Sequence, residues 1–352
     1  MAFQTTTDGG MTTMSPHNVT VVSVVKACLL AVTTTLILLG NSLCLIVLRY
    51  TRDGVSPVTK LFLISLTISD LLVGVLVGVP VVGSTALQSW PYGDAYCTVM
   101  AMCHVLYFNA GMSVLAINIE RYIAVIWPLK YPLIVTMARA AIVEVFIIFI
   151  LLLWLLLYVL MPDRMSFYYN NFSQCFIDSL NGTDYLGHIA MTLFIALPLL
   201  ITIVLHVRLF VLATHHASKV GNITLGSFKL RDSESSAGQS DQPHPDQNAQ
   251  PAAARPRTRR SPEAKAARTF FIMAVVLTIS WTPYYATITW ENLRSDPVPE
   301  ALAFTSQLLL LLNSIWNVII YYTRNDAFRK TANRLLGCCF RVHSWNDQEL
   351  MT

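Results

Sequence analysis

Seven long apolar runs constrain this sequence more than any other feature. A bilayer core about 30 Å thick needs roughly 20 apolar residues in each spanning helix. Seven runs meet that length: residues 21–48, 61–87, 97–126, 138–160, 189–213, 270–290 and 301–322. Backbone amides find no water in hydrocarbon, so these runs must be helices, and the alternation of barrel strands is absent. We predict an all-α membrane protein, a seven-transmembrane helix bundle with a short amphipathic eighth helix.

The composition agrees with lipid as the main solvent. Apolar residues make up 54% of the chain and charged residues only 12%, whereas about a quarter of a soluble domain is charged. Only Lys26, Arg164 and Arg294 lie on the side of the N-terminus, which leaves 21 of the 24 basic residues on the other side. This asymmetry predicts a plasma membrane protein with its N-terminus extracellular and its C-terminus cytosolic. The net charge of +4 then reflects topology and attraction to membrane lipid, and we expect no nucleic-acid binding.

The predicted organisation has three parts. Residues 1–20 form an extracellular tail, residues 21–323 the seven-transmembrane domain, and residues 324–352 an amphipathic helix and cytosolic tail. Within the domain, residues 214–262 form a long third cytosolic loop. Its stretch 232–260 has no aromatic, Leu, Ile, Val or Met and is predicted to be disordered. Three asparagines in outward-facing sequons are candidates for glycosylation: Asn18, Asn171 and Asn181.

Three motifs in the spans carry functional information. The third span ends in Glu120-Arg121-Tyr122, and an arginine at this depth is costly unless it is paired or meets water. The sixth contains Trp281-Thr282-Pro283, where proline removes a helix hydrogen bond and bends the span. The seventh contains Asn317 and Tyr321. From Gly40 to Cys339 the chain resembles the rhodopsin-like (class A) G-protein-coupled receptors, and its cytosolic motifs are most similar to those of amine-type receptors.

The resemblance implies a switch at the cytosolic face. Arg121 would pair with Glu120 at rest and meet the C-terminal helix of a heterotrimeric G protein after activation, while Leu129 would offer that protein an apolar contact. Glu263 would be a second partner of Arg121, and an exposed ion pair of about 0 to 1 kcal/mol would bias the equilibrium rather than lock it. The residues implied in coupling and switching are Glu120, Arg121, Tyr122, Leu129, Glu263, Trp281, Pro283, Asn317 and Tyr321.

Two positions depart from the family pattern. Val318 stands where a proline normally follows Asn317, which predicts a straighter seventh helix. His206 stands where the fifth helix usually carries the tyrosine that meets Tyr321 in the active state. Both departures touch the switch, so the activation geometry and the basal activity are left open.

Asp70 lies in the middle of the second span, and acids at that depth are functional by default. We expect no other acid to lie deep within the spans. Carboxylate and amide oxygens suit a hard cation, and the residues that resemble the family's buried sodium site are Asp70, Asn41, Asn313, Ser314 and Asn317. The serine usually contributed by the third helix is Ala110 here, with Asn109 or Ser113 as candidate substitutes. A water-filled polar network is the alternative, and no cofactor is required.

The expected ligand pocket differs from that of a conventional amine receptor. Amine receptors place an aspartate in the upper third helix to pair with the ligand ammonium, whereas no acid occurs between Ala95 and Ile119. Cys103 or His104 occupies that place. His104 could pair with an acidic ligand, and an ordinary hydrogen-bonded histidine is the alternative. The pocket is predicted to be mostly aromatic, lined by Cys103, His104, Tyr107, Phe194, Trp281, Tyr284, Tyr285 and Gln307.

Four cysteines carry predictions. Cys97 begins the third span and Cys175 is the only cysteine of the second outer loop, so the pair is expected to form a disulfide in the oxidising compartment and hold the loop over the pocket. The interval from Cys97 to the Glu-Arg-Tyr motif is one residue shorter than the family usually shows. Cys338 and Cys339 follow the amphipathic residues 325–336 and are candidates for palmitoylation, with plain cytosolic thiols as the alternative.

Other functions fit these residues less well. A retinal photoreceptor needs a lysine in the seventh span, and residues 301–322 contain none, so no retinal is expected. A transporter should show internal repeats and an enzyme clustered acids or metal ligands within the spans; neither pattern is seen. We predict a receptor, not an enzyme, that transmits binding of a small extracellular ligand to a heterotrimeric G protein by movement of helix six, with arrestin and kinases as further partners. The alternatives are an amine-like receptor with an atypical pocket, and a non-signalling seven-helix protein or transporter.

Overall fold

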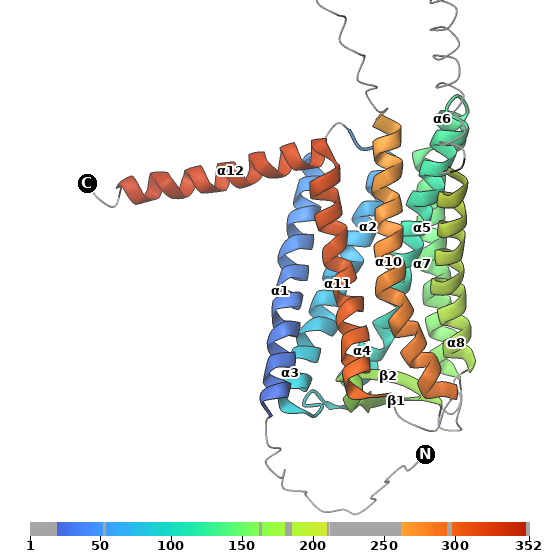
Figure 1. The fold of residues 1–352 in the computed structure, drawn as a ribbon, viewed down its shortest axis with the longest axis vertical. Coiled ribbons are helices and arrows are strands. Elements are labelled where there is room, and N and C mark those ends of the chain that lie inside the picture. Colours follow the sequence, from blue (N-terminus) through green and yellow to red (C-terminus); the bar gives the residue numbers. More distant parts are fainter. Residues whose placement is uncertain are drawn as a thin grey trace, which may run out of the picture.

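A computed structural model describes residues 20–51, 54–161, 164–179, 185–209, 211, 262–293 and 298–349. Within these residues, 7 helical spans are long and apolar enough to cross a membrane, which confirms the predicted fold class. Figure 1 shows them side by side in one bundle. The helices of spans one to four are α1 (Val21–Tyr50), α2 (Pro57–Val73) continued by α3 (Val79–Leu87), α4 (Gly93–Met102) continued by α5 (His104–Ile126), and α7 (Met137–Leu160).

The fifth span runs from Ile189 to Leu209. It combines α8 (Tyr185–Met191), a π-helical segment η3 (Thr192–Ala196) and the helical residues 197–209. The remaining elements are α6 (Tyr131–Ile134), β1 (Arg164–Tyr169), η2 (Asn170–Phe172), β2 (Gln174–Ser179), α10 (Pro262–Leu293), α11 (Glu300–Arg324) and α12 (Asp326–Glu349). Apart from Thr20 and Pro262, the predicted extracellular tail and third cytosolic loop lie outside the described residues.

Polar caps fix where the first two helices begin. The side chain of Thr20 accepts a hydrogen bond from the backbone N–H of Ser23 at 3.2 Å, and Ser56 accepts one from Thr59 at 3.1 Å. Pro57 takes the first position of α2, where a missing N–H costs nothing. The second helix therefore begins several residues before the apolar run that predicted it.

Three irregularities interrupt the spans. A π-helical segment, η1 (Gly74–Gly78), joins α2 to α3, and η3 lies in the fifth span; such segments are frequent at functional sites. The third span is interrupted at Cys103. This position lies between Cys97 and the Glu-Arg-Tyr motif, the interval that is one residue shorter than the family usually shows. The glycines of η1 let α1 approach closely, since a Cβ on Gly78 would lie 2.8 Å from Thr34 Oγ1.

The two ends of the bundle differ in structure. At the end where α1 begins, β1 and β2 form an antiparallel hairpin in which Tyr168 pairs with Cys175 (Figure 1). At the other end α12 turns away sideways from the bundle (Figure 1). The Asn325 side chain caps α12 by accepting from the N–H of Phe328 at 2.9 Å. The Phe328 ring, 3% exposed, packs against Tyr321 of α11 and anchors the helix.

Candidate functional site

An ion pair lies at the end of α5 that is remote from the hairpin. Arg121 Nε donates to Glu120 Oε2 at 2.5 Å, and Arg121 Nη2 donates to Glu120 Oε1 at 2.8 Å. Such two-point contacts are the strong form of an arginine–carboxylate pair. The Glu120 side chain is only 3% exposed, so its charge is balanced by protein donors rather than by water. The geometry is the one implied for the resting state.

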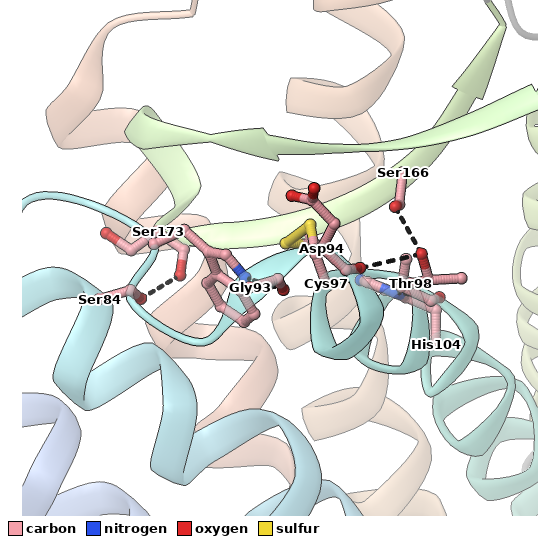
Figure 2. The surroundings of a disulfide bond; sticks show 11 residues. Ser84, Gly93, Asp94, Cys97, Thr98, His104, Ser166 and Ser173 are labelled. Atoms are coloured by element: carbon pink, nitrogen blue, oxygen red, sulfur yellow. Dashed lines mark hydrogen bonds between the residues drawn. A yellow bond between two sulfur atoms is a disulfide. The ribbon is translucent and has the colours of Figure 1, made fainter. Parts of the chain in front are cut away.

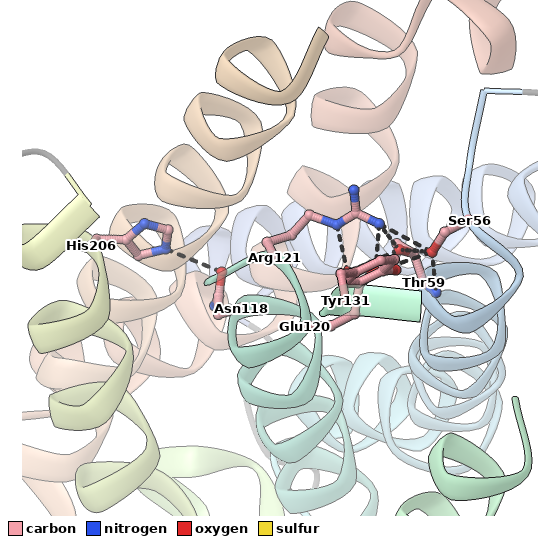
Figure 3. A network of polar contacts seen from close by, with 7 residues as sticks. All are labelled: Ser56, Thr59, Asn118, Glu120, Arg121, Tyr131 and His206. Carbon is pink, nitrogen blue, oxygen red and sulfur yellow. Dashed lines mark hydrogen bonds and ion pairs between the residues drawn. The ribbon is translucent and has the colours of Figure 1, made fainter. Parts of the chain in front are cut away.

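Three further side chains join this ion pair into a network (Figure 3). The hydroxyls of Ser56 and Thr59 each donate to Glu120 at 3.1 Å, and both accept from Arg121 Nη2. The hydroxyl of Tyr131 donates to Glu120 Oε1. The network thus ties the start of α2 and the one-turn helix α6 to the end of α5. Sequence reasoning missed these three residues; the helix-start pattern at Ser56 was the available signal.

The loop segment around α6 presents the remaining features of this end of the bundle. Burial raises the pKa of the Tyr131 hydroxyl, and its hydrogen bond to Glu120 raises it further, so the hydroxyl keeps its proton at physiological pH. Leu129 is 92% exposed, as a docking contact needs. Tyr122 is partly buried. The side chain of Glu263 in α10 lies outside the described ones, so its bridge to Arg121 stays a prediction.

His206 and Tyr321 have different surroundings in this structure. His206 Nε2 lies 3.1 Å from Asn118 Oδ1 (Figure 3). The His206 ring also meets Phe271 edge-on at 5.3 Å. The buried hydroxyl of Tyr321 has no hydrogen-bond partner among the described residues. His206 therefore connects the fifth span to α5, and Asn118 is a residue that sequence reasoning missed. α11 continues without interruption through Val318, as the missing proline predicts.

Asp70 lies at the centre of a buried polar network. Ser314 Oγ donates to its Oδ1 at 2.6 Å, and Asn317 Nδ2 donates to its Oδ2 at 3.1 Å. Asn41 Nδ2 donates to the carbonyl of Ser314 at 3.2 Å. Asn313, the residue before Ser314, is also buried. The contacts bring Asp70, Asn41, Ser314 and Asn317 together, and the sodium ion stays a prediction.

Glu144 of α7 is a second deep acid, which corrects the expectation that Asp70 is alone. It is 6% exposed and accepts a hydrogen bond from Ser65. Asn109 Nδ2 donates to Ser65 Oγ at 3.1 Å and to Ser69 Oγ at 2.9 Å. Asn109 therefore belongs to the Glu144 cluster between α2, α5 and α7, and its described contacts do not include Asp70. The other proposed substitute, Ser113, is fully buried with no partner among the described side chains.

At the hairpin end, Cys97 and Cys175 form the predicted disulfide between α4 and β2 (Figure 2). Two hydrogen bonds hold the hairpin on either side of it. Ser84 Oγ donates to the carbonyl of Ser173 at 2.6 Å, and the hydroxyls of Thr98 and Ser166 lie 2.7 Å apart (Figure 2). The loop between the fourth and fifth spans is thus fastened at three points across this end of the bundle.

Side chains of this loop enter the bundle. Phe172 and Gln174 are each 1% exposed. Gln174 Nε2 donates to Tyr284 Oη at 3.3 Å, and Gln307 Nε2 donates to Gln174 Oε1 at 3.1 Å. The amide of Asn171, an expected glycosylation site, donates to the carbonyl of Val298 at 3.1 Å. The loop therefore occupies the space beside α10 and α11.

A cavity remains between the third, fourth, fifth and sixth spans. It encloses about 860 Å³, a figure that includes its open mouth. Four of the eight predicted pocket residues line it: His104, Tyr107, Trp281 and Tyr284. Its other lining residues are Ala101, Met102, Val105, Phe108, Leu151, Trp154, Leu155, Tyr158, Phe176, Gly187, Ala190, Met191 and Ile288.

The other four predicted pocket residues are not part of the cavity lining. Gln307 is engaged by Gln174 of the loop, and the Tyr285 hydroxyl lies 3.3 Å from that of Thr192. Phe194 packs against Phe108 and Trp154, which themselves face the cavity. Cys103 is buried at the interruption of the third span. Four lining residues of α7, the fourth span, were not predicted, because the sequence does not show which face of that uniformly apolar helix turns inward: Leu151, Trp154, Leu155 and Tyr158.

Comparison with known proteins decides the family. The family "7 transmembrane receptor (rhodopsin family)" matches residues 40–321. The chain belongs to this family. It is therefore a G-protein-coupled receptor, a class of signalling protein without enzymatic activity. The histamine H2 receptor of Rattus norvegicus is 29% identical over 92% of this chain and 84% of the relative. G-protein coupled receptor 161 of Mus musculus is 28% identical over 87% of this chain and 56% of the relative. The thyrotropin-releasing hormone receptor of Gallus gallus is 24% identical over 86% of this chain and 75% of the relative.

The remaining predicted residues of the receptor stand as follows. Pro283 lies inside α10, two residues after Trp281, whose side chain is 2% exposed at the cavity. Cys338 and Cys339 belong to α12, but their side chains lie outside the described ones, so palmitoylation stays a prediction. Asn18 and Asn181 also lie outside the described residues.

Proposed function

We propose that this receptor binds a small extracellular ligand in the cavity and passes the signal through α10 to a heterotrimeric G protein at the network around Arg121. The cavity includes Trp281, and Pro283 lies within the same helix, where it can bend the span. A ligand that binds better when α10 has swung outward would shift the population toward that state. The observation that carries the proposal is this sharing of α5 and α10 between the ligand cavity and the cytosolic end.

The proposed orientation places the hairpin outside the cell. Most basic residues lie beyond the opposite end, as the positive-inside rule requires of the cytosol. The disulfide between Cys97 and Cys175 gives independent support, because disulfides persist in the oxidising extracellular compartment. Arg121 and Leu129 would then face the cytosol, where the G protein is, and where we also expect arrestin and receptor kinases to bind.

An amine ligand is the second candidate, because of the similarity to receptors named for histamine. An ammonium buried without an opposite charge is costly. The residues that line the cavity include no aspartate and no glutamate. We therefore propose a ligand that is not recognised through an acid of this receptor.

The test is ligand-free G-protein activation in cells at matched surface expression. We expect Arg121→Ala to abolish the basal signal or reduce it at least about tenfold, because the guanidinium would be the contact made after activation. Arg49→Ala, an exposed arginine at the end of α1, is the control and should signal like the wild type. Equal signalling by the wild type and Arg121→Ala would refute the assigned role.

A further inference from the structure

The cavity has an unusual set of polar atoms for a receptor related to amine receptors. Its lining contains no acid, no lysine and no arginine. Two buried polar atoms of the lining have no hydrogen-bond partner in the described part of the chain: His104 Nε2 and Trp281 Nε1. Buried polar groups are nearly always paired, and an unpaired one costs free energy. A ligand bound in the cavity would supply the missing partners.

The hydrogen-bonding role of His104 follows from its other ring nitrogen. Nδ1 lies 2.8 Å from the carbonyl oxygen of Ala101. A carbonyl can only accept, so Nδ1 must carry the hydrogen, and Nε2 of the neutral ring is then an acceptor. The ring is held in place by Phe176 at 4.9 Å and Tyr107 at 6.1 Å between centroids. The cavity thus presents one oriented acceptor that calls for a ligand O–H or N–H.

Trp281 offers the cavity a hydrogen-bond donor, the counterpart of the His104 acceptor. An indole Nε1–H can only donate, so Trp281 calls for a ligand acceptor. The Trp281 ring is 5.8 Å from Tyr107 and 6.3 Å from Tyr284, both edge-on, and 2% of the residue is exposed. The amides of Gln174 and Gln307 bond to each other and are not part of this lining. The other lining residues are aromatic or aliphatic, and three of them also carry a hydroxyl: Tyr107, Tyr158 and Tyr284.

We propose that the ligand is an uncharged, mostly apolar molecule that carries a hydroxyl or amide N–H, and that this group donates to His104 Nε2. The inference rests on the proposed function and names the ligand class of the same cavity. A cation would find no acid in the lining, and an anion would find no lysine or arginine. Apolar area would supply most of the affinity, and the donor would set the orientation.

The test measures binding to the purified full-length receptor in lipid nanodiscs, with four matched probes. These are para-phenylphenol, para-methoxybiphenyl, para-phenylbenzylammonium and biphenyl carboxylate. We expect the phenol to bind about tenfold more tightly than the ether and more tightly than both ions, as one buried hydrogen bond allows. In His104→Phe the phenol and the ether should bind equally. Thr305→Val removes an exposed hydroxyl of α11 that is not part of the cavity lining, and should keep the preference for the phenol.

A spectroscopic readout separates this hydrogen bond from a packing effect. In the wild type with isotope-labelled histidine, the phenol should shift the nitrogen resonance of His104 Nε2, and the ether should not. His104→Gln keeps an acceptor and should regain part of the preference. No binding of the phenol, equal binding of phenol and ether, or tighter binding of the ammonium would each overturn the ligand class. Because no G protein is present, these outcomes are independent of the Arg121 test of signalling.

Discussion

At the scale of single residues, Glu120 collects more donors than an arginine partner alone could give. Its carboxylate accepts from Arg121 and from three hydroxyls, those of Ser56, Thr59 and Tyr131. The tyrosine comes from α6 and connects the ion pair to the loop that exposes Leu129. A hydrogen bond to a charged group contributes about 1.5 to 3 kcal/mol. Each hydroxyl is thus able to influence the balance between the resting arrangement and its alternatives.

Removing the tyrosine hydroxyl should therefore weaken the resting state. We expect Tyr131→Phe to raise basal G-protein activation by up to about tenfold at matched surface expression, because the ring stays and only one donor to Glu120 is lost. Tyr50→Phe is the matched control, since Tyr50 is 59% exposed at the end of α1. An unchanged basal signal in Tyr131→Phe would mean that this hydrogen bond is also kept in the active state.

Glu144 offers a second test at this scale. An ionised acid deep in a span is costly, and Glu144 has no basic partner among the described side chains. We expect it to act as an uncharged acceptor for Ser65. Glu144→Gln should then keep the melting temperature within about 2 °C, whereas Glu144→Ala should lower it by about 4 °C or more, because the partly buried Ser65 hydroxyl loses the acceptor for its hydrogen. Thermal unfolding of the purified receptor measures both. A larger loss in Glu144→Gln than in Glu144→Ala would show that the charge is required.

At the scale of elements, the hairpin of β1 and β2 is a structural part of the bundle. Phe172 at its tip is 1% exposed, and its ring meets Phe176 at 5.6 Å and Tyr284 at 6.4 Å, both edge-on. Phe172→Ala should remove about 3 to 5 kcal/mol of packing and lower the melting temperature by several degrees. Phe149→Ala, on the lipid-facing side of α7 where the ring is 57% exposed, is the control and should change it little. Similar losses in both variants would mean that Phe172 contributes no more than a lipid-facing side chain.

The same elements show how far the sequence determines this fold. The seven spans were predictable because lipid demands long apolar helices, and each run is a local signal. The entry of Gln174 and Phe172 into the bundle was not, because it depends on a loop pinned by contacts distant in sequence. Gln307 was therefore assigned to the ligand pocket, whereas it bonds to Gln174.

The switch region likewise contains contacts that the sequence predicts and contacts that it does not. The Glu120–Arg121 pair is adjacent in sequence and was predictable. The contact of His206 with Asn118 joins residues 88 positions apart, and nothing local marks it. Glu144 was overlooked because an acid near one end of a very apolar run is easily read as interfacial. Its 6% exposure and its contact with Ser65 show that it lies within the packed helices.

At the scale of the whole molecule, the cavity and the Arg121 network lie toward opposite ends of the bundle; α5 contributes residues to both, and α10 lines the cavity and packs against α5. If the two ends are coupled through one equilibrium, the coupling must be reciprocal. A ligand that changes the affinity for the G protein by some factor has its own affinity changed by the same factor. The relation holds whether the ligand raises or lowers the affinity for the G protein, so it applies to a probe that favours the active state and to one that favours the resting state.

Reciprocity gives a prediction that does not require the natural ligand. We expect the affinity of the receptor for para-phenylphenol to change about 5-fold or more when nucleotide-free G protein is added, and the phenol to change the affinity for the G protein by the same factor. Arg121→Ala should bring both factors to about one, because it removes the contact made in only one state, while Arg49→Ala should leave them unchanged. Titration calorimetry in nanodiscs measures both affinities. A factor that survives Arg121→Ala would place the coupling elsewhere than this arginine, and a factor of one in the wild type would mean that the probe binds both states equally.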